Sequence, residues 1–82
     1  MANIESTLEK ETLKWLKKLE REVRGMIITG EVRDIDSSIE NIHAYISDCK
    51  HFLEKKDLVN AFEAVVYAWG IWETLKHLKL IE

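Results

Sequence analysis

The chain has 82 residues, which makes one domain with a modest core. It is 46% hydrophobic and 33% charged, and it has three glycines and no proline, which favours a globular helical protein over a turn-rich β fold. The formal net charge of −3 argues against nucleic acid as the main partner, because phosphate binding needs a concentrated basic surface.

The lone Cys49 excludes an internal disulfide and a cysteine cluster for zinc, and it fits a reducing compartment. No apolar run approaches the roughly 20 residues that span a bilayer, and no basic and apolar leader opens the chain. We therefore expect a cytoplasmic protein with no membrane segment, built as a single helical domain over residues 1–82.

The first expected helix covers about residues 4–26. Ser6 and Glu9 have the spacing of a capping box, which predicts the helix start. We place the connector that follows roughly between Gly25 and Val32, because glycine ends helices by entering the left-handed region. The Ile27-Ile28 pair could instead extend the helix to Gly30. One face of the helix carries a stripe that recurs at steps of three and four: Leu8, Thr12, Trp15, Leu19, Val23 and Met26.

The opposite side of this helix carries six cations: Lys10, Lys14, Lys17, Lys18, Arg21 and Arg24. They could form a ridge for phosphate or for a membrane surface. We favour a solvated face instead, because glutamates nearly cancel the charge over the same stretch. Glu20–Arg24 and Lys18–Glu22 have the spacing of supporting ion pairs.

The second expected helix begins at Arg33 or Asp36 and ends near Lys55. Its buried seam steps by four and three without a break: Ile35, Ile39, Ile42, Ile46, Cys49 and Leu53. A short turn follows, and Asp57 is a good N-cap for the third helix, which reaches about Leu80. A connection this short makes the flanking helices antiparallel neighbours.

The apolar residues of the third helix cover well over half its circumference: Leu58, Ala61, Phe62, Val65, Val66, Ala68, Trp69, Trp72 and Leu75. Such a helix either lies between two others or offers a face to another chain. The sequence therefore predicts an all-α fold, a three-helix up-down-up bundle in which the second and third helices form a helical hairpin.

A polar strip runs along the rest of the third helix through Glu63, Tyr67, Gly70 and Thr74. With Asp48 from the second helix and Glu73, it could bind a small ligand or a nucleotide between the second and third helices. The alternative is structural: Glu63 and Tyr67 lock the helices together, and Gly70 admits a neighbouring backbone. We favour the structural interpretation, because a glycine inside a helix costs about 1 kcal/mol relative to alanine and calls for a packing reason.

Trp69 and Trp72, with Trp15 on the first helix, bring more aromatic surface than a bundle of this size can bury completely. Tryptophan is also a preferred anchor at interfaces between proteins. Trp69 and Trp72 are therefore the candidate interface, and the candidate partner is a second copy in a homodimer or another protein.

No pattern in the chain points to catalysis, to a metal or to a cofactor. His43 and His51 diverge by about 80° around their helix, and His77 fits a surface pair with Glu73. Cys49 lies on the isoleucine seam, as a small buried hydrophobe does. We find no phosphate loop, nucleophile elbow or metal-site signature.

The predicted hairpin of the second and third helices also carries a series of single residues and short motifs: Tyr45, Asp48, Phe52-Leu53-Glu54-Lys55, Asp57, Ala61-Phe62-Glu63-Ala64, Tyr67-Ala68 and Gly70. It resembles the signature of an archaeal family known as domain of unknown function 357, over about residues 45–72. Lys56 departs from the family pattern, which usually has glycine there, and residues 71–74 depart from its usual Leu-Asp-Ala. The resemblance implies a small helical fold and an archaeal cytoplasmic setting, with no assigned activity.

The function we expect is that of a small helical interaction or scaffold module that associates with itself and carries no catalytic site. The alternative is a protein that binds a small ligand or nucleotide through Asp48, Glu63, Tyr67 and Glu73.

Overall fold

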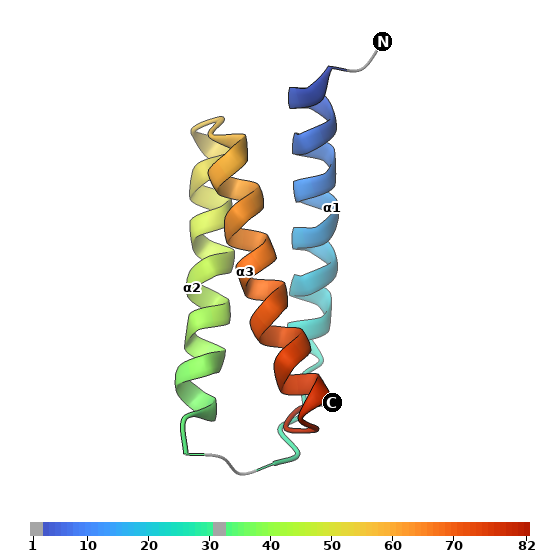
Figure 1. Ribbon diagram of the computed structural model, residues 1–82, viewed down its shortest axis with the longest axis vertical. Coiled ribbons are helices and arrows are strands. Elements are labelled where there is room, and N and C mark those ends of the chain that lie inside the picture. The colour runs from blue at the N-terminus through green and yellow to red at the C-terminus, as the bar shows by residue number, and fades with distance from the viewer. Residues whose placement is uncertain (1–2, 31–32) are drawn as a thin grey trace.

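The computed structural model describes residues 3–30 and 33–82, and this part of the chain contains three helices. They are α1 (Ile4–Arg24), α2 (Ile35–Glu54) and α3 (Leu58–His77). In Figure 1, α1 and α3 run in the same direction and α2 runs the opposite way. The predicted up-down-up bundle and its α2–α3 hairpin are therefore confirmed.

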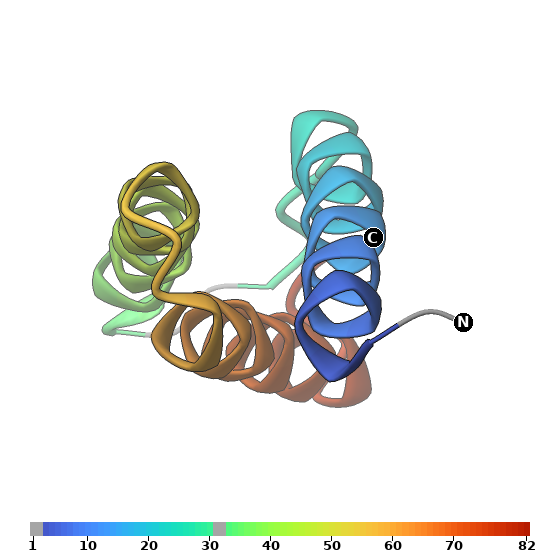
Figure 2. The same ribbon diagram turned by 90° about the horizontal axis from the view of Figure 1, so that it is seen from above.

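The central element of the bundle is α3, which packs against both other helices. Figure 2 shows α1 and α2 on either side of it. Its buried face is built largely from Ala61, Ala64 and Ala68, and such small side chains let neighbouring helices approach closely. Leucines of α1 and isoleucines of α2 complete the core around it.

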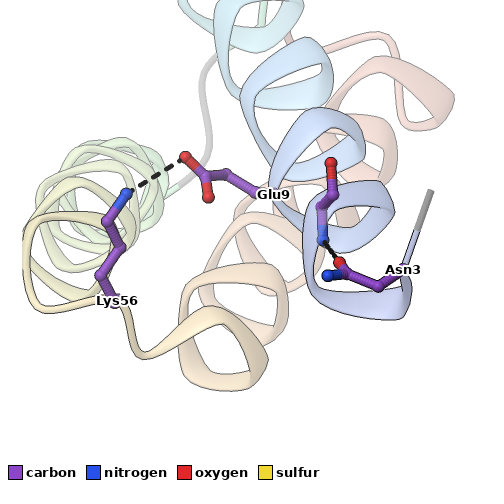
Figure 3. Close-up of polar contacts among 4 residues, drawn as sticks. Asn3, Glu9 and Lys56 are labelled. Carbon is purple, nitrogen blue, oxygen red and sulfur yellow. Dashed lines mark hydrogen bonds and ion pairs between the residues drawn. The ribbon is translucent and has the colours of Figure 1, made fainter. Parts of the chain in front are cut away.

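The start of α1 differs from the prediction. Asn3 is the N-cap, and its side-chain oxygen accepts a hydrogen bond of 2.7 Å from the backbone N–H of Ser6 (Figure 3). The predicted capping box is wrong, because Glu9 turns the other way and meets Lys56 of the α2–α3 turn at 3.4 Å. At the other end Gly25 has φ −91°, so this glycine does not use the left-handed region; Val32, the far end of the predicted connector, lies outside the described residues.

The turn between α2 and α3 closes as a Schellman motif. The N–H of Asp57 donates to the carbonyl of Phe52 at 2.9 Å, and the N–H of Lys56 donates to that of Leu53 at 3.1 Å. Lys56 itself has φ 60°, the conformation that suits glycine. Asp57 stands at the predicted N-cap position, but its carboxylate accepts from the side chain of Asn60 at 2.7 Å and caps no backbone N–H.

A second Schellman motif ends α3, with Lys79 at φ 60° and the N–H of Leu80 bonded to the carbonyl of Leu75 at 3.0 Å. The chain then turns back, and Ile81 pairs with Ile28 in an isolated antiparallel bridge. Ile81 is 3% exposed, so this bridge ties the α1–α2 connector to the core. Nothing in the periodicity of the sequence predicts this contact.

Of the helices in the described ranges, none is both long enough and apolar enough to cross a membrane.

Candidate interaction surface

An apolar stripe lies exposed along α3. Val59 is 69% exposed, Phe62 36% and Val66 48%, and Trp69 is partly buried. These residues follow one another at steps of three and four, so they lie on one side of the helix. Neither α1 nor α2 covers Val59, Phe62 and Val66, whereas Trp69 at the end of the stripe contacts α1.

Helix α1 extends this surface. The rings of Trp15 and Trp69 meet edge to face with centroids 5.8 Å apart, and Nε1 of Trp69 donates to the carbonyl oxygen of Trp15 at 3.0 Å. Nζ of Lys18 lies 5.1 Å from the ring centroid of Trp15 and 5.7 Å from that of Trp69. Ile4, at the beginning of the helix, is 85% exposed.

A hollow of about 410 Å³ lies along the line where the two helices meet, and its walls include Trp15, Phe62 and Val66. We call the surface around it the α1–α3 face. On α1 it consists of Ile4, Glu11, Trp15 and Lys18, and on α3 of Val59, Phe62, Val66, Trp69, Gly70 and Glu73.

Trp72 does not belong to this surface, so the prediction that it forms part of an interface needs correction. It is 2% exposed, because it lies on the side of α3 that faces the core. Its Nε1 donates to Glu22 of α1 at 3.1 Å, and Nζ of Lys76 lies 3.6 Å from the same carboxylate oxygen. Trp72 therefore holds α1 and α3 together.

The predicted polar strip does not converge. Asp48, Glu63, Tyr67 and Glu73 are all exposed, and among the described residues no hydrogen bond joins any two of them. Glu73 lines the hollow of the α1–α3 face, whereas the ring of Tyr67 lies 5.5 Å from that of Tyr45 on the α2 side. These side chains do not form a shared binding site.

Gly70 also differs from its expected role. A Cβ built on it would meet no neighbouring atom within 4 Å beyond its own stretch of helix, so no backbone packs against it. The helix continues through this position without a break. Gly70 lies open on the α1–α3 face.

The glutamates of α1 form ion pairs across helices instead of along α1. Glu20 meets Lys50 of α2 at 2.9 Å, and Glu22 meets Lys76 of α3 at 3.6 Å. The predicted pairs of these glutamates with Arg24 and Lys18 are therefore replaced. The outer side of α1 keeps its exposed cations: Lys10, Lys14, Lys17, Arg21 and Arg24.

Cys49 is fully buried on the seam of α2, as predicted. Burial, with a further contribution from the nearby carboxylate of Glu20, raises the pKa of the thiol to about 11, so the reactive thiolate is scarce at neutral pH. In residues 3–30 and 33–82, no three His, Cys, Asp or Glu side chains are grouped so that they could hold a metal ion.

Over residues 3–30 and 33–82, these features define a small all-α protein of three helices with an uncovered apolar face on α1 and α3. The model of the family described as protein of unknown function (DUF357) matches residues 14–81. The chain belongs to this family, for which no activity is assigned.

A solved structure supports the same assignment. The crystal structure of protein AF1782 from Archaeoglobus fulgidus, a member of the same family, is 40% identical to this chain and superposes with a TM-score of 0.85. The match covers 98% of this chain and 97% of that one. A search of curated proteins gives no match.

Proposed function

We propose that the protein is a non-catalytic interaction module that binds another polypeptide through its α1–α3 face. The observation that carries the proposal is the exposed stripe of Val59, Phe62 and Val66. Single apolar residues are common on protein surfaces, but a contiguous apolar patch rimmed by charge is typical of an interaction site.

The composition of the face supports this proposal. Aromatic anchors at the centre and charged residues at the rim are the usual anatomy of a protein interface. Here Trp15 and Trp69 lie at the centre, and Lys18 and Glu73 lie beside them. A polypeptide with an apolar stripe of its own would cover the aromatic rings and leave the charged groups at the edge.

We also propose that the module works in the cytoplasm. The chain has one cysteine, and this thiol is buried and unpaired, which suits a reducing compartment.

The test is a comparison of two variants that place one carboxylate on different surfaces. Val66→Asp puts the charge on the α1–α3 face, and Ala44→Asp puts it on the exposed side of α2. Both positions are exposed, so we expect both variants to fold, which circular dichroism will check.

Each variant and the wild type are used for affinity capture from a native lysate of the source organism, followed by mass spectrometry. We expect a polypeptide, either a second copy or another protein, that the wild type and Ala44→Asp retain in stoichiometric amount and Val66→Asp loses. Retention of the same polypeptides by Val66→Asp, or no retained polypeptide at all, would refute the proposal.

A further inference from the structure

We infer that the polypeptide bound by the α1–α3 face is a second copy of this chain, in a dimer whose two-fold axis runs parallel to the helices. This inference rests on the proposed function and names its partner. It follows from the register of the two helices, from their charges and from the area of the face.

The register comes from the contacts between α1 and α3. They join residues 50 to 54 positions apart: Glu22 with Trp72, Lys18 with Trp69, and Trp15 with Trp69. Because the two helices run in the same direction (Figure 1), each residue of α1 lies within about one helical turn of the level of the residue 54 positions later on α3.

Both helices present a seven-residue repeat on the face. On α1 the repeat is Ile4, Glu11 and Lys18, and on α3 it is Val59, Val66 and Glu73. A two-fold axis parallel to the helices keeps every residue at its own level, and it places α1 of one copy opposite α3 of the other. Ile4 then lies opposite the turn of α3 that carries Val59 of the partner subunit, and Lys18 lies opposite the turn that carries Glu73 of the partner subunit.

Charge complementarity favours this arrangement. Lys18 and Glu73 are both exposed, and neither has an ion pair within the described residues. By symmetry the dimer contains two such pairs, one at each edge of the shared apolar stripe. An antiparallel axis would set α1 against α1 and α3 against α3, which takes Lys18 away from Glu73.

The exposed Gly70 also supports this arrangement of the dimer. A glycine in the middle of a helix costs about 1 kcal/mol relative to alanine, and nothing within the monomer packs against Gly70. In the dimer this position lies within about one helical turn of the level of Trp15 of the partner subunit. A side chain of that size needs the space that the missing Cβ leaves.

The area is sufficient for a weak dimer. A helix of 20 residues is about 30 Å long. Two adjacent helices therefore offer a face of roughly 600 Å² in each copy, or about 1,200 Å² in total, which is the lower limit for a specific interface. One contact is unfavourable, because Glu11 faces Val66 of the partner subunit. We expect dissociation in the micromolar range.

Charge exchange tests both the partner and its geometry. Lys18→Glu and Glu73→Lys are prepared separately and studied by sedimentation equilibrium, alone and as an equimolar mixture. Each variant alone places two like-charge contacts in its own homodimer, and we expect a dissociation constant at least about tenfold higher than that of the wild type. The mixture restores both pairs, and we expect association within about threefold of the wild type.

Lys17→Glu is the matched control, because it makes the same charge change on the outer side of α1. It should dimerise like the wild type. A mixture that stays monomeric, or a control that weakens as much as Lys18→Glu, would overturn the parallel geometry. If the wild type stays monomeric up to millimolar concentration, the inference that the partner is a second copy of this chain is wrong. The proposed function would still stand in that case if Val66→Asp lost a different captured protein.

Discussion

Two lysines hold backbone conformations that normally belong to glycine. Lys56 and Lys79 both have φ 60° at the C′ position of a Schellman motif. A side chain in the left-handed region costs roughly 1–2 kcal/mol. The resemblance to a family with glycine at the first position indicated an unusual turn there, but the sequence held no sign of the second.

We predict that Lys79→Gly stabilises the protein, because glycine adopts this conformation without steric cost. The larger flexibility of glycine in the unfolded chain offsets part of the gain, so the expected increase is on the order of 0.5–1 kcal/mol. Urea unfolding followed by circular dichroism measures it. Lys79→Ala is the control, because it removes the charge and keeps the Cβ; an equal gain in that variant would show that the backbone is not the cause.

The raised pKa of Cys49 makes stability depend on alkaline pH. The folded thiol has a pKa of about 11, against an ordinary value of 9.0, so the unfolded chain releases this proton first. The contribution is complete below pH 9 and is lost as the pH rises toward 11. We predict that the wild type loses more unfolding free energy between pH 8 and pH 10.5 than Cys49→Ala does. Urea titrations at both values test this, and parallel losses would contradict it.

At the scale of elements, periodicity located each helix but could not fix every residue on it. The isoleucine seam of α2 was predicted correctly, because Ile35, Ile39 and Ile42 each stand between two polar residues. In α1 the adjacent Trp15 and Leu16 are both apolar, and only the packing shows that Leu16 is the buried one. Trp69 and Trp72 were equally hard to tell apart, because both lie on the wide apolar arc of α3. The width of that arc does not show which part of it a neighbouring helix covers.

Gly70 offers a test that separates the monomer from the dimer. We predict that Gly70→Ala raises the stability of dilute protein by about 1 kcal/mol, because alanine favours helix and its Cβ meets open space. The same substitution should weaken dimerisation, because the Cβ fills the space for Trp15 of the partner subunit. Thermal unfolding at low concentration and sedimentation at high concentration give the two readouts. A stabilised variant that dimerises as before would contradict the close approach at this position.

At the scale of the whole molecule, the sequence predicted the class and order of the helices, but not the way they meet. The wide apolar arc of the third helix already allowed a place between the two other helices. The Ile28–Ile81 bridge and the ion pairs of Glu9, Glu20 and Glu22, in contrast, join distant parts of the chain. Periodicity describes one helix at a time, so it contains no information on such contacts. The candidate polar strip failed for the same reason, because residues on one predicted face need not converge with residues on another helix.

Dimerisation should also appear in the stability of the protein. A partner that binds only the folded chain raises the melting temperature as the concentration increases. We predict a rise over a hundredfold range of concentration for the wild type and for Ala44→Asp, and no rise for Val66→Asp. Differential scanning calorimetry measures it. Identical behaviour of the three proteins would argue against self-association through this face.

The placement of the three indole groups gives the protein its own optical reporters. Trp15 and Trp69 form a pair at the surface beside the ammonium group of Lys18, whereas Trp72 is enclosed between α1 and α3. The fluorescence of the surface pair should respond to whatever covers it, and that of Trp72 should respond to the loss of the fold. Docking should therefore change the fluorescence of the surface pair alone, whereas unfolding should change that of all three tryptophans.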